Sequence, residues 1–104
     1  PDKYVAATDL GMHAGKTITV LAYFITRKQV PTKNSEQMFF GTFVDSHLDW
    51  IDTVHFPDSA RNYPLHSNGF YRMTGKVVED FGVFSLEVHK MNKVGYKQRK
   101  YANL

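Results

Sequence analysis

The sequence contains no cysteine and no long apolar run, and each absence excludes a class of protein. Without cysteine there is neither a disulfide framework nor a thiolate metal site, which argues against a small secreted scaffold and fits a reducing cytoplasm. No stretch approaches the roughly 20 apolar residues that cross a bilayer, and the opening segment "PDKYVAATDL" lacks the layout of a signal peptide. We therefore expect a cytoplasmic protein with no membrane partner.

The 104 residues fit one domain that can bury a real core, and we expect a monomer. The net charge of +3 is only a weak indication of a polyanionic partner, but the charge is unevenly distributed. Residues 34–60 carry acids and no Lys or Arg: Glu36, Asp45, Asp49, Asp52 and Asp58. Residues 88–104 carry bases and no acid: Lys90, Lys93, Lys97, Arg99 and Lys100.

The segment "GMHAGKT" (residues 11–17) resembles a phosphate-binding P-loop but lacks its geometry. A P-loop has four residues between its glycines and a helix after them. Here three residues separate Gly11 from Gly15, and "KTITVLAYFIT" follows, whose β-branched and aromatic residues predict a strand. The segment is therefore read as a short helical turn that ends at Gly15 and leads into a strand.

Alternating and aromatic-rich segments predict five strands, at about residues 16–29, 37–45, 48–56, 70–79 and 83–91. Pro57 and Pro64 bracket a single helical turn, and the last two strands are joined tightly near Gly82. We predict an all-β fold, a five-stranded antiparallel OB-fold barrel with a short helix or turn between its third and fourth strands. An SH3-like barrel is the structural alternative. Residues 1–91 form the barrel with a short N-terminal lead-in, and 92–104 form a basic extension.

The first strand is long enough to bend, and the parity of its side chains can change at the bend. Our interpretation turns Tyr23 and Arg27 toward solvent or a ligand. It places the following residues in the core: Ile18, Val20, Ala22 and Phe24.

Phe40 is the candidate base-stacking residue. It lies three positions before Phe43, so the two rings face opposite sides of the strand unless a bulge intervenes. An aromatic side chain left on the open face of an OB barrel can stack on a base. The alternative is that both rings are buried, one in the barrel and one under the loop 57–69.

Three basic residues flank the loop between the first two strands: Arg27, Lys28 and Lys33. That loop borders the binding groove in OB-folds, where cations neutralise phosphates, although a solvated loop needs such charges as well.

Either face of the third strand can point inward, the one with Trp50, Val54 and Phe56 or the one with Ile51, Thr53 and His55. We include His55 among the candidate nucleic-acid-binding residues, with Tyr23.

No pattern indicates catalysis, a cofactor or a metal. The five histidines lack the spacing with carboxylates that metal sites commonly show. Asp45 and Asp49 lie near a predicted hairpin, where polar residues are expected anyway. No serine has a His and Asp set around it that spacing supports. We expect no catalytic residue, no metal and no cofactor.

Several segments, in order and spacing, resemble the OB-fold domain near the C-terminus of the alpha subunit of bacterial DNA polymerase III, a C-family replicative polymerase. These segments are "GKTITV", "MFFGTFVD", "VHFP" and "GKVVEDFGVFSLEV", and together they cover about residues 15–91. In that family the Phe that precedes the Asp of the second strand by five residues lies on the nucleic-acid face, which is Phe40 here. "HLDW" replaces the more usual glycine-containing turn, so the start of the third strand departs from the family.

The resemblance implies a fragment of a larger polymerase whose catalytic aspartates lie elsewhere, so the fragment is not an enzyme. We expect it to hold single-stranded DNA during replication and to contact other polymerase domains and replisome proteins. One rival is a protein-docking barrel, which acidic residues 45–58 favour if they line the groove. Another is an anticodon-type RNA-binding domain. Contacts to 2′-OH groups would make such a domain bind RNA more tightly than DNA of the same sequence.

Overall fold

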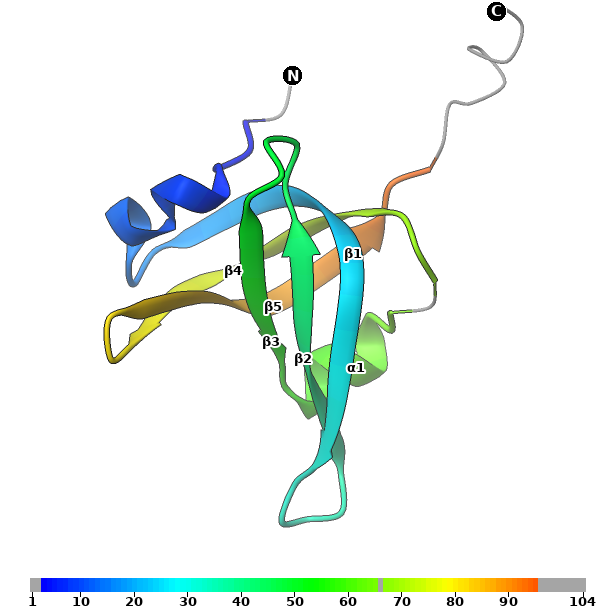
Figure 1. Cartoon of the computed structure of the whole chain (residues 1–104). Coiled ribbons are helices and arrows are strands. Elements are labelled where there is room, and N and C mark those ends of the chain that lie inside the picture. Colours follow the sequence, from blue (N-terminus) through cyan, green and yellow to red (C-terminus); the bar gives the residue numbers. More distant parts are fainter. Residues whose placement is uncertain (1–2, 66, 96–104) are drawn as a thin grey trace, which may run out of the picture.

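The computed structural model describes residues 3–65 and 67–95, and these form a closed five-stranded barrel with two short helices (Figure 1). The elements in chain order are η1 (Ala7–His13), β1 (Thr17–Pro31), β2 (Gln37–Val44), β3 (Trp50–His55), α1 (Pro57–Asn62), β4 (Phe70–Asp80) and β5 (Val83–Lys93). The predicted barrel is thus confirmed, together with the short helix between the third and fourth strands. Residues 96–104 of the predicted basic extension lie outside the described residues.

The strand order around the barrel is β1-β2-β3-β5-β4, with β4 pairing back onto β1. Four of these contacts are antiparallel, as predicted, but β3 and β5 pair in parallel through Thr53↔Leu86 and Val54↔Glu87. The sheet is therefore mixed. The parallel contact closes the barrel between strands that are distant in the chain, so no hairpin signal in the sequence could indicate it.

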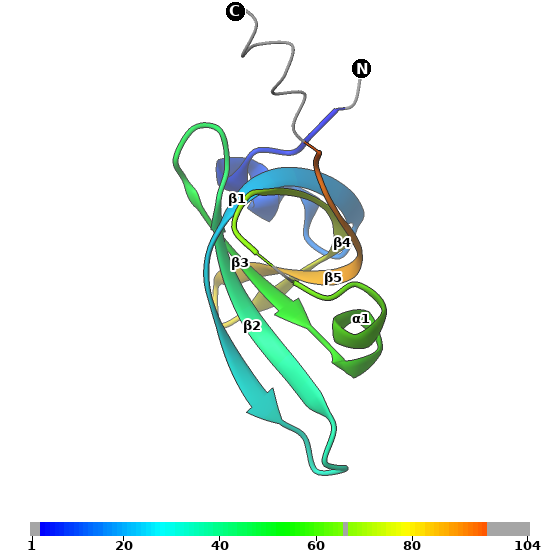
Figure 2. The ribbon, with the colours of Figure 1, turned by 90° about the vertical axis from the view of Figure 1, so that its right-hand side faces the viewer.

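Strand β1 serves both halves of the barrel because it bends near its middle (Figures 1 and 2). Its first part pairs with β4 from Thr17 to Tyr23, and its second part pairs with β2 from Tyr23 to Pro31. A β-bulge lies between Phe24 and Thr26. The bulge changes which side chains lie on the face of the core: even-numbered residues before it and odd-numbered residues after it, although Arg27, Gln29 and Pro31 are exposed.

The core fills the barrel as the alternation of β1 predicted. Ile18, Val20 and Ala22 are buried, while Phe24 is half-buried and packs edge-on against Phe43. Among the described residues, seven apolar side chains at the centre have no exposed surface: Val20, Ala22, Phe43, Ile51, Met73, Val77 and Leu86. Burial of this apolar surface supplies the main favourable term in folding.

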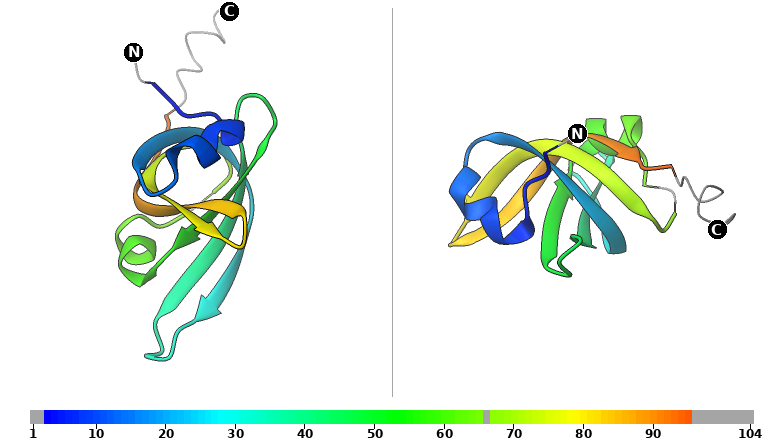
Figure 3. Two further views of the ribbon diagram at one scale, coloured as in Figure 1. Left: turned by 90° about the vertical axis from the view of Figure 1, so that its left-hand side faces the viewer. Right: turned by 90° about the horizontal axis from the view of Figure 1, so that it is seen from above.

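The two short helices cover different parts of the barrel (Figure 3). Helix η1 packs against β1, β4 and β5, and α1 packs against β2, β3 and β5.

After η1 the chain passes through Gly15, whose φ of 80° favours glycine, and the Gly15 N–H donates to the Val77 carbonyl at 2.7 Å. The predicted helical turn before β1 is confirmed. No helix within residues 3–65 and 67–95 is long and apolar enough to span a membrane.

The turn between β2 and β3 is organised by Asp45, which is buried. Its carboxylate accepts hydrogen bonds from the backbone N–H groups of Ala7 (2.8 Å), His47 (2.9 Å) and Asp49 (3.0 Å). Burial raises the pKa of the Asp45 carboxyl, but these backbone hydrogen bonds and the charge of His47 lower it, and the net pKa lies below the usual value. Asp45 thus has the structural role in the turn that the sequence predicted.

Candidate nucleic-acid interface

The outer face of β1, β2 and β3 carries an exposed aromatic ring beside a cation. Phe40 is 45 % exposed, whereas Phe43 on the same strand has no exposed surface, so the prediction that the two rings face opposite sides is confirmed. Phe40 pairs with Lys28 on β1 and with Val54 on β3. Because residues directly opposite each other project from the same side of a sheet, these three side chains form a row across the outer face.

A groove runs from this row toward the β4–β5 hairpin. Three segments supply its walls: β2, β3 and the tip of the hairpin. The side chains that line it include Phe40, Thr42, Asp52, Val54, Phe81 and Val83. The floor is thus the outer face of two neighbouring strands, and one end is bounded by the hairpin tip. A groove formed by strand faces and a loop is the kind of surface on which OB-folds bind extended chains.

The charges around the groove are divided by sign. Lys28 lies in the row with Phe40, and Lys33 is exposed in the loop 32–36 between β1 and β2. Asp52 and Asp80, by contrast, line the groove on the side of β3 and the hairpin. Cations therefore gather on the β1 side, where a phosphate backbone would be attracted, and carboxylates gather on the other side.

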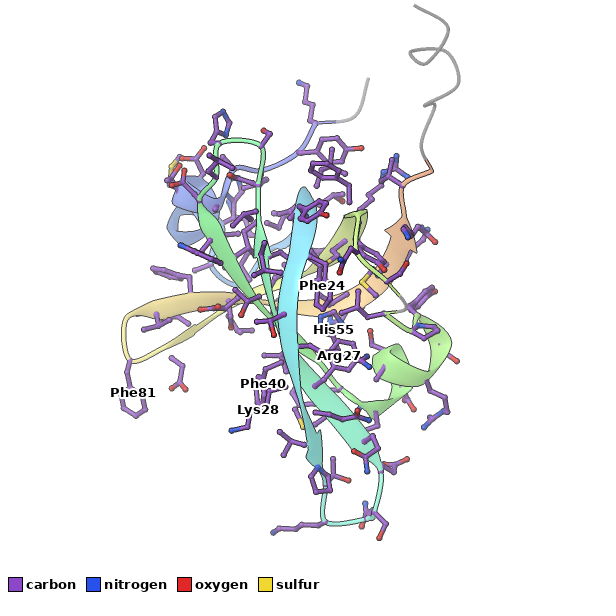
Figure 4. All side chains as sticks on the ribbon, turned by 45° about the vertical axis from the view of Figure 1, so that its right-hand side comes forward. Phe24, Arg27, Lys28, Phe40, His55 and Phe81 are labelled. Atoms are coloured by element: carbon purple, nitrogen blue, oxygen red, sulfur yellow. The ribbon has the colours of Figure 1, made fainter. Side chains whose placement is uncertain are left out.

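Arg27 lies on the other face of the sheet from Lys28 and Phe40 (Figure 4). Its guanidinium carbon is 5.4 Å from the centroid of the Phe39 ring, and its Nη1 donates to the Leu65 carbonyl at 3.3 Å. Arg27 is exposed, as expected, but it does not share a face of the sheet with Lys28. Successive side chains of a strand alternate between faces, and the bulge after Phe24 sets the register in which Lys28, and not Arg27, lies with Phe40.

Tyr23 is half-buried where β1 passes from β4 to β2. Its ring meets the Phe70 ring edge-on, with centroids 5.2 Å apart. In register it lies beside Val44, about 13 Å along β2 from Phe40 at the usual rise of a strand. Tyr23 is thus on the outside of the barrel, as expected, but apart from the row that contains Phe40.

His55 is inside the barrel and has no exposed surface, which corrects its inclusion among the interface residues. It stacks on Phe39 with ring centroids 4.1 Å apart, and its Nε2 is hydrogen-bonded to Thr53 Oγ1 at 2.7 Å. Burial lowers the pKa of His55 to about 4, so the imidazole is neutral at pH 7. The structure also decides between the two faces of β3: the face with Ile51 points inward, and the face with Trp50 points outward.

The sequence reasoning missed Phe81, which is 98 % exposed at the tip of the β4–β5 hairpin and lines the groove. The signal was present in "VEDFGVF", where an aromatic residue occupies a turn position that polar residues usually hold.

In the part of the chain that the structure describes, no group of three or more His, Cys, Asp or Glu could hold a metal ion.

Comparisons with known proteins locate a similar fold but no family. No protein-family model matches the sequence, and no curated protein sequence matches it. Among solved structures, the chain is similar to the structure of U. maydis Replication protein A bound to ssDNA, with a TM-score of 0.61 and 21 % sequence identity. The match covers 99 % of this chain and 84 % of that chain. At this identity the likeness concerns the fold, and it agrees with the OB-like barrel described above.

Proposed function

We propose that this chain is a single-stranded DNA-binding OB module, in which the groove and the adjoining row of Lys28, Phe40 and Val54 hold one strand by stacking and charge. The observation that carries the proposal is the exposed ring of Phe40 in register with Lys28. An exposed Phe at the centre of a sheet face is unfavourable for an isolated domain, because its apolar surface meets water. A base that stacks on the ring removes that surface from water.

The proposed mechanism has two parts. Stacking on Phe40 is worth about 1–3 kcal/mol per base and differs little between bases, because every base has a π-face. Lys28 and Lys33 neutralise phosphates on the β1 side, which makes binding sensitive to salt. The similar Replication protein A structure is described as bound to ssDNA, which supports single-stranded DNA as the ligand class.

The larger context of the module is also a proposal. The order of "GKTITV", "MFFGTFVD", "VHFP" and "GKVVEDFGVFSLEV" supports an origin in the alpha subunit of a C-family replicative polymerase. In that setting the module holds the template strand during replication in the cytoplasm and packs against other polymerase domains or replisome proteins. It has no catalytic role of its own, and nucleotidyl transfer takes place elsewhere in the polymerase.

A second candidate function is a protein-docking barrel, and the position of Asp52 and Asp80 favours it. Both carboxylates line the groove and would repel phosphates that pass close to them. Asp45, in contrast, is held in the β2–β3 turn and does not bear on this question. The two candidates differ in what the groove accepts: a nucleic acid in one case, a basic protein surface in the other.

An NMR titration of the ¹⁵N-labelled chain with unlabelled oligo-dT of about 15 nucleotides, close to the footprint of one OB-fold, tests the proposal. We expect the largest shift changes at the amides of Phe40, Lys28 and Val54, and small changes in α1. Changes centred on α1, or none at low salt, would contradict a DNA-binding groove. A basic peptide that produces the same pattern more strongly than DNA would favour the docking barrel.

A further inference from the structure

The β4–β5 hairpin is closed by an unusual pair of residues. Asp80 and Val83 are the last paired residues of the two strands, so Phe81 and Gly82 alone form the turn. Their φ angles are 53° and 80°, both in the left-handed region. Two-residue turns with positive φ at both positions strongly favour Asn-Gly or Asp-Gly, because a bulky L-residue is strained there. Phe81 therefore holds a conformation that disfavours its own side chain.

Packing does not compensate for this strain. The Phe81 side chain is 98 % exposed, so it buries almost no apolar surface against the barrel. An exposed Phe in a strained turn gains little from packing, and strain of this kind concentrates at sites of function. The side chain is also one of those that line the groove with Phe40.

We propose that Phe81 is a second base-stacking residue, which binds an unpaired base at the hairpin end of the groove. This inference rests on the proposed function. Phe40 and Phe81 come from different hairpins and lie at separate places (Figure 4), so they contact different nucleotides of one strand. Val54 and Val83 also line the groove and give it an apolar surface on which the sugar and base faces pack.

Leu48 shows that strain and exposure alone do not make a binding residue, and it serves as a matched control. It has a φ of 67° and is 78 % exposed in the turn between β2 and β3. Its N–H donates to the Asp45 carbonyl at 2.9 Å, as in a tight turn. Leu48 does not line the groove, however, so its replacement changes the turn without changing the proposed DNA contacts.

The test compares Phe81→Asn and Leu48→Asn by thermal unfolding and by fluorescence anisotropy with labelled oligo-dT. Asn tolerates positive φ, so both variants are expected to melt about 2–6 °C higher than the original chain. Only Phe81→Asn is expected to weaken DNA binding, by about fivefold or more, because the ring that stacks on one base is removed. If Phe81 had a merely structural role, the Phe81→Asn variant would not gain thermal stability and at the same time lose affinity for oligo-dT.

Phe81→Trp is the third variant, and it is expected to retain or strengthen binding because Trp also stacks on bases. Unchanged affinity of Phe81→Asn would overturn the inference while leaving the proposed function in place. Equal weakening by Phe81→Trp and Phe81→Asn would also overturn it, because the weakening would then not come from stacking. Failure of the original chain to bind any oligonucleotide would remove the proposed function, and this inference with it.

Discussion

Phe39 and Phe40 are adjacent in β2 and point to opposite sides of the sheet, one into the barrel and one into solvent. Phe39 is 3 % exposed and stacks on His55, whereas Phe40 is 45 % exposed and lies beside Lys28. Successive side chains of a strand alternate between faces, so this difference follows from the backbone alone. It separates a ring that stabilises the fold from a ring that is available to a ligand.

The Phe40→Ala variant is expected to weaken binding to oligo-dT by about 1–3 kcal/mol and to leave the fold intact, because the exposed ring contributes to stacking and little to the core. Fluorescence anisotropy measures the first effect and thermal unfolding the second. Phe39→Ala is the control, with an expected loss of folding free energy of about 3–5 kcal/mol. If Phe40→Ala binds DNA as tightly as the original chain, Phe40 is not a stacking residue.

Replacing Lys28 and Lys33 together by Ala is expected to flatten the dependence of affinity on salt. On a single strand, the slope of log K against log salt falls by about 0.7 for each phosphate that the protein no longer neutralises. Arg27→Ala is the comparison, because Arg27 faces Phe39 and α1 and should leave the slope unchanged. A slope that responds to Arg27 and not to the two lysines would place the phosphates on the opposite face.

Asp52→Asn separates the DNA-binding groove from the docking barrel. Asp52 is exposed in the groove, so the removal of its charge is expected to tighten oligo-dT binding severalfold at low salt, an effect that fades at high salt. Asp58→Asn, which makes the same charge change on α1, should have a smaller effect. Weaker DNA binding by Asp52→Asn would show that the carboxylate contacts the ligand and does not repel it.

The stability of the fold is expected to depend on pH through His55. Burial lowers its pKa to about 4, and the unfolded chain titrates near 6.5, so between these values the unfolded state binds more protons. The contribution of neutral His55 to the free energy of unfolding is therefore fully present above about pH 6.5. The free energy of unfolding falls by up to about 3 kcal/mol as the pH drops through 4. Urea unfolding at pH 7 and pH 4.5 measures the difference.

His55→Gln is the control for this pH dependence. Gln keeps a hydrogen-bonding group near Thr53 but does not titrate, so the variant should be less stable at pH 7 and should lose less stability between pH 7 and pH 4.5. Asp45, whose pKa is lowered, adds its own loss of stability only at lower pH, below its usual value of 3.8. An equal pH dependence in the original chain and His55→Gln would contradict the assignment.

The strands and the outline of the barrel could be predicted because their signals are local. The alternation in β1 placed Ile18, Val20 and Ala22 in the core, and the spacing of Phe40 and Phe43 placed them on opposite sides. Such patterns depend only on the period of a strand, which a single sequence displays.

The remaining features depend on contacts between distant segments. The bulge after Phe24 decides that Lys28, and not Arg27, lies on the face of Phe40, and no residue of β1 marks its position. On β3 the outer face carries Trp50, and the inner face carries the Thr53–His55 pair, so hydrophobicity alone favours the wrong face. The polar pair can be buried because its members hydrogen-bond each other, a relationship that hydropathy does not display.

The central claim is that the groove binds single-stranded DNA, and one titration tests it most directly. The full chain is titrated against fluorescently labelled oligo-dT of about 15 nucleotides at low and at moderate salt, and anisotropy is recorded. We predict saturable binding at low salt that weakens steeply as salt rises, because phosphates are neutralised by Lys28 and Lys33. No binding even at low salt would contradict the claim and would favour the protein-docking barrel.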